Sequence, residues 1–298
     1  MQDDGSAAPK RFRRGRLTRP FRPGLLCTAM ASIARVGTEI QKSEFAQTLR
    51  SNLRYVLRND FFRRLERDAL GAEGYRLFVR EKYSAVGYFG AFLENAERRL
   101  RPISPELAEA VKCNRLDEAG YFAGEFRPAY RHETWRLRSL KRFGVTRAML
   151  AGPRLEGSRC HETRMRSLAV SEDAFELAGA LLFLELFVVY EMKALIAAFE
   201  RDLPQEFPQR GYSYDRFPFN RHEYWYGHAL HDTWHFRALE EPLISLLAGE
   251  GSGRRLAALC AGIDRATRAK ADFYGTQLFD AMASADWNHF TAPREMCR

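Results

Sequence analysis

The segment Leu181-Leu-Phe-Leu-Glu-Leu-Phe-Val-Val-Tyr-Glu-Met192 is the most apolar stretch of this 298-residue chain, and it is interrupted by two acids. The apolar runs on either side of these acids are too short to cross a bilayer, which takes about 20 residues. We therefore predict a helix that is buried in the core of a protein, within residues 171–202.

Apolar side chains recur at helical spacing on both sides of this segment. The predicted helices cover residues 43–68, 73–100, 104–118, 128–143, 171–202, 222–248 and 253–285. A polar, proline-containing loop is expected at 203–221. The sequence has no alternating strand pattern, no repeat and no linker after residue 38. It therefore predicts an all-α protein, with a single helical bundle over residues 39–298.

Positive charge is concentrated at the start of the chain. Residues 1–24 carry seven basic and two acidic side chains, a net charge of +5, which leaves +4 of the total of +9 for the rest. We expect residues 1–38 to be a disordered basic tail, or Met30 to be the true start. The body is nearly balanced, so we expect no nucleic-acid or membrane partner. A basic arm that contacts an anionic surface is the alternative for the tail.

The cysteines are odd in number and scattered, and no two of them form a Cys-x-x-Cys pair. They are Cys27, Cys113, Cys160, Cys260 and Cys297. This pattern indicates neither a disulfide framework nor a thiolate zinc site, and it fits a reducing cytoplasm.

The segment His228-Ala-Leu-His-Asp-Thr-Trp-His235 holds three of the seven histidines of the chain. On a helix, His228, Asp232 and His235 lie on one stripe, whereas His231 points away from it. Two imidazoles and a carboxylate along about 10 Å of helix suit two metal ions better than one. Nitrogen and oxygen ligands favour iron or manganese over a metal that prefers thiolates. A solvated polar helix face is the alternative interpretation.

The acids of the buried segment are further candidate ligands. An unpaired carboxylate is costly to bury, and either a metal or an ion pair with an arginine relieves this cost. We expect Glu191 to be a metal ligand. Glu185 is placed similarly, but it lies about 120° around the helix from Glu191, so we do not expect both at one site.

A third candidate group lies in residues 114–135, which are interrupted by glycines and by Pro128. It offers His132 and two carboxylates. Glu125 precedes His132 by seven residues and would share its face on an unbroken helix. Glu118 precedes it by fourteen and reaches it only if the chain breaks between them, as the glycines and the proline suggest.

Together these segments resemble the haem-oxygenase-like di-iron oxidase and oxygenase family, over roughly residues 40–285. Asn114-x2-Asp-Glu118-x-Gly is similar to the family signature Asn-Leu-x-Asp-Glu-x-Gly, and Tyr190-Glu191 is similar to its middle helix. His-x3-Asp-x2-His from His228 is similar to its last motif, and His132-x2-Trp to an earlier one. The resemblance implies a haem-oxygenase-like bundle in which the metal ligands are Glu118, His132, Glu191, His228, Asp232 and His235. Glu125 stays the alternative to Glu118, because its spacing from His132 is the more usual one in the family.

The same resemblance implies a non-haem di-iron oxidoreductase with two Fe(II) per chain and O2 as co-substrate. An external donor would supply electrons, because the sequence has no glycine fingerprint of a flavin or nicotinamide site. We expect a small-molecule substrate that bears an amine or a carboxylate, in natural-product biosynthesis. A homodimer is left open.

Four further residues bear on the substrate. Family N-oxygenases carry an extra carboxylate ligand on an early helix, so Glu94 favours amine N-oxygenation; an exposed acid is its alternative role. Arg127, Arg131 and Arg237 are candidates to bind a substrate carboxylate. Oxidative C–C cleavage or desaturation of an amino acid or fatty acid is the alternative reaction. A non-catalytic helical protein that binds a partner is the alternative of another class.

Overall fold

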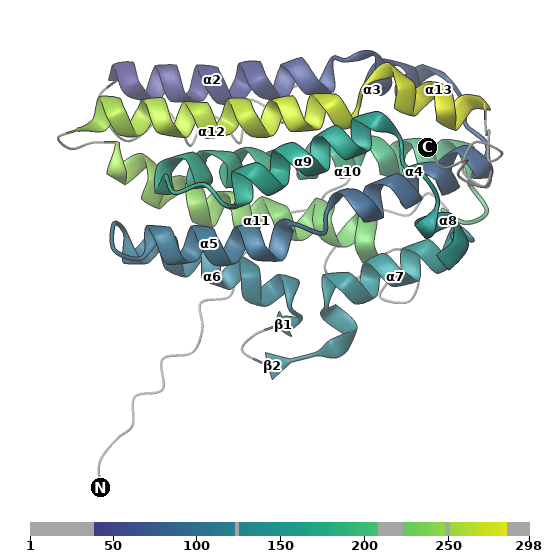
Figure 1. Ribbon diagram of the computed structural model, residues 1–298, viewed down its shortest axis with the longest axis horizontal. Coiled ribbons are helices and arrows are strands. Elements are labelled where there is room, and N and C mark those ends of the chain that lie inside the picture. Colours follow the sequence, from purple (N-terminus) through teal and green to yellow (C-terminus); the bar gives the residue numbers. More distant parts are fainter. Residues whose placement is uncertain (1–38, 123–124, 208–222, 248–250, 285–298) are drawn as a thin grey trace, which may run out of the picture.

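The computed structural model describes residues 39–122, 125–207, 223–247 and 251–284. The predicted tail at residues 1–38 lies outside this range. In chain order the helices are α2 (Glu39–Leu57), α3 (Asp60–Arg67), α4 (Ala72–Ala85), α5 (Phe89–Leu100), α6 (Pro105–Glu118), the 3-10 helix η1 (Pro128–Tyr130), α7 (His132–Arg142), α8 (Arg147–Ala151), α9 (Glu156–Ala169), α10 (Ala174–Asp202), α11 (Glu223–Leu246), α12 (Ser252–Phe273) and α13 (Thr276–Ser284). Two short strands, β1 (Tyr121–Phe122) and β2 (Glu125–Phe126), pair antiparallel between α6 and α7. The predicted all-α bundle is confirmed (Figure 1).

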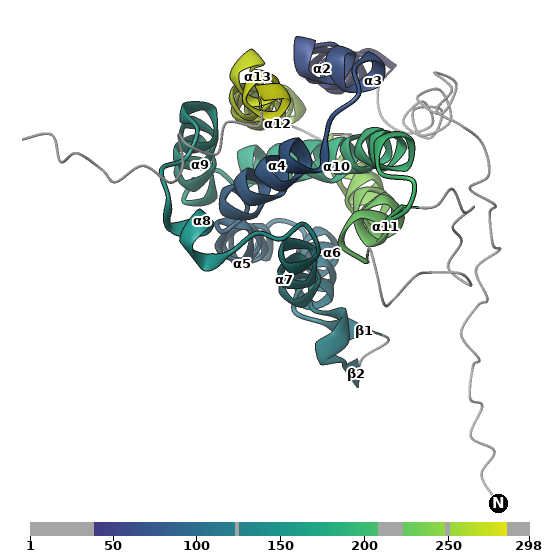
Figure 2. The ribbon, with the colours of Figure 1, turned by 90° about the vertical axis from the view of Figure 1, so that its right-hand side faces the viewer.

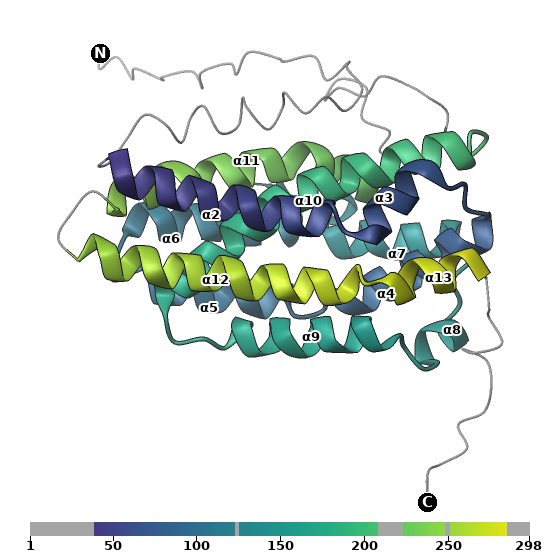
Figure 3. The same ribbon diagram turned by 90° about the horizontal axis from the view of Figure 1, so that it is seen from above.

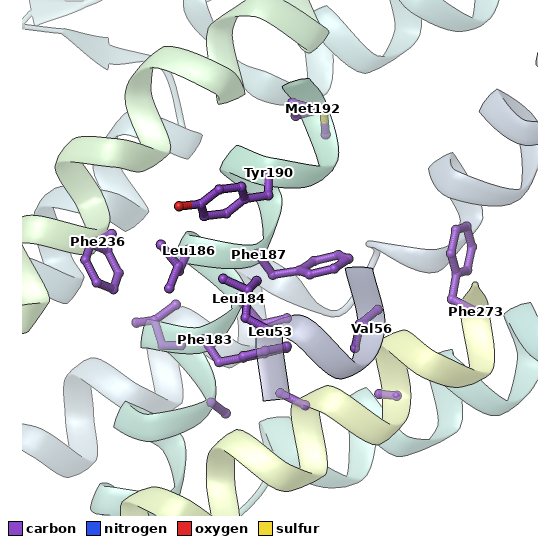
Figure 4. Packing of buried hydrophobic residues seen from close by; sticks show 14 of the residues in the cluster. Leu53, Val56, Phe183, Leu184, Leu186, Phe187, Tyr190, Met192, Phe236 and Phe273 are labelled. Atoms are coloured by element: carbon purple, nitrogen blue, oxygen red, sulfur yellow. The ribbon is translucent and has the colours of Figure 1, made fainter. Parts of the chain in front are cut away.

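Helix α10 lies inside the bundle, as its apolar sequence predicts. It packs along α11 and α12, while α2 covers α12 and α5 pairs with α6 (Figures 2 and 3). Apolar residues occur all around α10, which is typical of a helix that is buried on every side. Phe183 and Phe187 are fully buried, and their rings stack at 5.8 Å. Figure 4 shows them beside Leu53 of α2, with Phe236 of α11 on the other side of α10.

Close contact between α10 and α12 depends on two glycines. A Cβ atom added to Gly262 would lie 1.9 Å from the carbonyl oxygen of Glu176, and one added to Gly179 would lie 2.1 Å from that of Leu259. These contacts are with backbone atoms, which do not rotate away. Glycine therefore allows the two helices to approach this closely.

The structure divides four of the predicted helices. The one expected at 253–285 is broken between α12 and α13, and the one expected at 128–143 is divided into η1 and α7. The helix expected at 43–68 is broken at Asn59, whose side chain accepts a hydrogen bond from the backbone N–H of Phe62 and so begins α3. The helix expected at 73–100 is broken between α4 and α5. Helices α8 and α9 lie outside every predicted helix. No helix in the described ranges is long and apolar enough to span a membrane.

The connection from α6 to α7 determines how one part of the site is built. Ser104 caps α6 by accepting from the N–H of Leu107, with Pro105 in the first turn, as predicted. After Glu118 the chain turns through Gly120, whose φ of +91° suits glycine, and enters the β1–β2 pair. Helix α7 then begins at His132. The chain break required for Glu118 to reach His132 is therefore present.

Candidate metal centre

Glu118, His132 and His228 form the first group of potential metal ligands. They come from the end of α6, the start of α7 and the middle of α11, and one ligand atom of each lies within 4.8 Å of the others. Nδ1 of His132 lies 2.7 Å from Oε1 of Glu118, and Nε2 of His228 lies 4.0 Å from the same oxygen. A carboxylate and two imidazoles that converge in this way can hold one metal ion.

Glu185, Asp232 and His235 form the second group, from α10 and the next turns of α11. Nδ1 of His235 lies 3.3 Å from Oε2 of Glu185 and 3.7 Å from Oδ1 of Asp232. The side-chain amide of Asn114 donates to the other oxygen of Glu185 at 2.7 Å, which fixes the orientation of that carboxylate. This second group can hold a second ion.

One cavity of about 530 Å³ connects the two groups. Its lining includes Glu118, His132 and His228 of the first group, and Glu185 and Asp232 of the second. The stripe of α11 that contains His228, Asp232 and His235 thus contributes residues to both groups. Side chains of α4, α5 and α10 form other parts of the cavity wall.

The histidines of the first group are oriented by their neighbours. Nδ1 of His228 lies 2.6 Å from the carbonyl oxygen of Tyr224, so Nδ1 carries the proton and Nε2 is left as the electron-pair donor. The ring of Trp135 stacks on that of His132 at 4.5 Å, with an angle of 21° between the rings. Nε2 of His132 is buried and has no hydrogen-bond partner in the described part of the chain. Outer contacts of this kind are typical of metal-ligating histidines.

The charges of the groups also suit a cation. Burial and then the repulsion from Glu185 raise the pKa of Asp232 well above its usual value, because two buried carboxylates resist ionising together. Burial, with a contribution from His132, lowers the pKa of His228 to about 3, so this imidazole is neutral at pH 7. Burial alone would raise the pKa of Glu118, but His132 and His228 lower it to about 2. A neutral imidazole and an ionised carboxylate are the forms that bind metals.

Two residues that were not predicted as ligands, Asp117 and His231, lie against these groups. Asp117 places Oδ2 at 3.1 Å from Nε2 of His235 and at 3.3 Å from Nδ1 of His231. Burial would raise the pKa of Asp117, but its hydrogen bonds with His231 and His235 hold it well below its usual range. His231 thus contacts the site through Asp117 and does not belong to either ligand group. The signal in the sequence was the position of Asp117 directly before Glu118.

Glu191 is the expected ligand that the structure places elsewhere. Both Nζ of Lys82 and the hydroxyl of Tyr274 donate to its Oε1 atom, so this carboxylate is an ion-pair partner instead. Glu185 occupies the position that we expected for Glu191. The two acids are 3% and 0% exposed, so burial does not distinguish them. Their positions distinguish them, because they lie about 120° apart around α10. Glu185 faces α6 and α11, whereas Glu191 faces α4 and the end of α12.

The structure also places the alternatives and the predicted substrate residues. The side chain of Glu125 is 71% exposed and pairs with Arg127 at 2.8 Å, so neither reaches the ligand groups. Glu94 and Arg131 line the cavity. Arg237 is exposed on α11 and does not line it.

No family model matches the sequence, and no curated protein matches it. Among solved structures, the chain is similar to a domain of unknown function with a haem oxygenase-like fold from Shewanella denitrificans, at 16% sequence identity and a TM-score of 0.54, over 80% of this chain and 94% of that domain. A CADD-like protein of unknown function from Nostoc punctiforme is 13% identical with a TM-score of 0.49, over 87% of this chain and 98% of the other. The first similarity confirms that the chain has a haem-oxygenase-like fold.

Proposed function

We propose that this protein is a non-haem di-iron oxidoreductase that uses O2 to oxidise a small metabolite. The observation that carries the proposal is the pair of ligand groups beside one cavity, with Glu118, His132 and His228 in one group and Glu185, Asp232 and His235 in the other. Pairs of mixed carboxylate and histidine sites within a helical bundle are typical of di-iron proteins.

The donor set supports iron. It offers three imidazoles and three carboxylates and no thiolate, which suits iron or manganese. The close approach of Glu185 and Asp232 gives a physical reason for a cation, because a bound ion would let both carboxylates ionise. The hydrogen bond from Nδ1 of His228 to Tyr224 also presents Nε2 for binding.

Two ferrous ions held by these residues would supply electrons to reduce O2 and so oxidise a bound substrate. The chain itself contributes position and protection from water. Trp135 and Tyr224 are buried against the first group, and Asn114 fixes Glu185 in the second. The electrons that reset the centre would come from an external reductant.

We propose an amine- or carboxylate-bearing substrate, with amine N-oxygenation as the reaction. Its support is the position of Glu94, which lines the same cavity as the ligands and could serve as an extra carboxylate. Arg131 also lines the cavity and can contact a substrate carboxylate at its edge. Oxidative C–C cleavage or desaturation is the alternative outcome, because the same centre would serve either reaction.

The test is an iron count on protein reconstituted with ferrous iron without oxygen, followed by O2 uptake with amines, amino acids and fatty acids. Wild type should bind about two irons per chain, and both Glu118→Ala and Glu185→Ala should lose iron, because removal of one ligand weakens the whole site. Glu125→Ala is the matched control, since it removes an exposed carboxylate from the same connection.

Equal iron contents in wild type, Glu118→Ala and Glu185→Ala would refute the ligand assignment. A protein that binds zinc or no metal, and consumes no O2 with any compound, would instead support a non-catalytic bundle that binds a partner.

A further inference from the structure

Two lysines lie buried beside the proposed metal centre. Lys82 comes from α4 and is 4% exposed, and Lys270 comes from α12 and is 3% exposed. Both line the cavity that the metal-ligand groups also line. Lysine is rarely buried to this extent unless its charge is paired, so a partner is expected for each of the two.

The two lysines differ in their partners. Lys82 pairs with Glu191, which also accepts a hydrogen bond from Tyr274. Lys270 makes no ion pair or hydrogen bond with any residue that the structure describes. Its Nζ lies 5.3 Å from the centre of the Phe187 ring, and the negative charge of Glu191 acts on it without a direct contact. Two ammonium groups thus share one carboxylate, which leaves a net charge of +1 on the cluster of Lys82, Lys270 and Glu191 when both lysines are protonated.

An uncompensated buried ammonium destabilises a fold. Burial, followed by the repulsion from Lys82, lowers the pKa of Lys270 to about 7, which is the expected response to this cost. A methionine would fill the same space without a charge. A buried lysine without a carboxylate of its own is therefore suited to an anionic group that enters the cavity and completes the cluster.

The rest of the wall indicates what carries that anion. Apolar side chains of α5 and α10 line the same cavity, among them Leu93, Leu184, Val188 and Met192. The cavity volume of about 530 Å³ is typical of sites for small organic molecules. A single negative charge balances this cluster, whereas a doubly charged phosphate would exceed it and a protonated amine would be repelled by the two lysines.

The arginines of the cavity do not fill this role as well. Arg115 pairs with Glu97 at 2.8 Å, and Arg136 pairs with Glu133. Arg131 is exposed. Among the cavity-lining cations that the structure describes, Lys270 is therefore the buried one that lacks a carboxylate.

We propose that Lys270, with Lys82 beside it, binds the carboxylate of a monocarboxylate substrate, and that the apolar part of this substrate lies along the side chains of α5 and α10. This inference rests on the proposed function in that it takes the metal-lined cavity as the substrate site. It implies that the group to be oxidised, which is the amine in the N-oxygenation proposed above, lies at a distance from the carboxylate, toward the two ligand groups.

The test is calorimetric titration of the full chain with straight-chain carboxylates from butanoate to decanoate. Acetate provides the head group alone, and 1-octanol provides an apolar body without charge. Octanoate should bind wild type about tenfold or more tightly than 1-octanol, because a hydrogen bond to a charged group contributes at least that factor. In Lys270→Met, octanoate should bind about as weakly as 1-octanol does.

Lys193→Met is the matched control. Lys193 is a half-buried lysine of α10 that lies outside the lining of the cavity, and its variant removes the same charge. It should leave the affinity for octanoate within about twofold of wild type, as surface changes usually do. Lys270→Met should also melt at the same temperature as wild type or higher, because an uncompensated charge is removed.

Three outcomes would overturn the inference: no carboxylate of the series binds wild type, octanoate and 1-octanol bind equally, or Lys270→Met binds octanoate as wild type does. A Lys270→Met protein that does not fold would also overturn it, since Lys270 would then be a structural residue. The iron count is independent of these titrations. Lys270-dependent binding without iron would refute the di-iron proposal alone, and two irons without carboxylate binding would refute this inference alone.

Discussion

Glu191→Gln tests the position of the second acid of α10. The substitution keeps the size of a side chain that is 0% exposed but removes the carboxylate that pairs with Lys82. Removing one partner of a buried ion pair costs about 3–5 kcal/mol, because the other charge is left uncompensated. At about 2–4 °C per kcal/mol for a domain of this size, the melting temperature should fall by about 6–20 °C. Iron binding should persist, because Glu185 is the acid in the ligand group.

The pH dependence gives a second, independent measurement. In wild type, burial and the charge of Lys82 lower the pKa of Lys270 to about 7, and the negative charge of Glu191 keeps it from falling further. Without Glu191 this pKa should fall further, and Lys270 should then lose its proton more readily. The destabilisation of Glu191→Gln should therefore shrink as the pH rises from about 6 to about 9. Melting curves by circular dichroism, with iron counted on the same samples below the transition, measure both effects.

Glu200→Gln is the control on the same helix. Glu200 is half-buried and accepts a hydrogen bond from the hydroxyl of Tyr226 at 3.1 Å, so its loss should cost about 0.5–1.5 kcal/mol. If the melting temperature of Glu191→Gln equalled that of Glu200→Gln, but Glu191→Gln lost its iron, Glu191 would be a metal ligand after all. The assignment of Glu185 would then be refuted.

Three further predictions concern the core, a buried charge and the tail. Gly262→Ala should lower the free energy of unfolding by about 1–3 kcal/mol or more, because its Cβ would lie 1.9 Å from the carbonyl oxygen of Glu176. Gly253→Ala is the control and should not lower it, because a Cβ at this position has no atom within 4 Å. Equal melting curves for the two variants would contradict the prediction and show that α10 and α12 can move apart. Between about pH 7 and about pH 10.5 the unfolded chain binds more protons at Lys270 than the folded chain does. Wild type should therefore gain stability relative to Lys270→Met as the pH rises through this range. Denaturant titrations of both proteins at several pH values measure this difference. A chain that begins at Met30 should keep its helical content, melting temperature and iron, because residues 1–24 have too few large apolar side chains to pack, and a fall of many degrees would contradict this.

The sequence determined the local features of this protein. Ser104 and Pro105 define the start of α6, and the apolar residues around α10 define a buried helix. The spacing of His228, Asp232 and His235 places them on one stripe of α11 wherever that helix packs. Each of these features depends on residues that are neighbours along a helix, so the helical repeat alone is enough to predict it.

Tertiary structure decided which acids meet that stripe. Because α10 is apolar on every side, its sequence has no polar face to define its rotation, and only packing against α6 and α11 turns Glu185 toward His235. The turn after Glu118, not the spacing of Glu125, brings a carboxylate to His132. The meeting of Lys82 and Lys270 joins helices that lie far apart in the chain. Such contacts depend on how whole helices dock, and no local repeat encodes them.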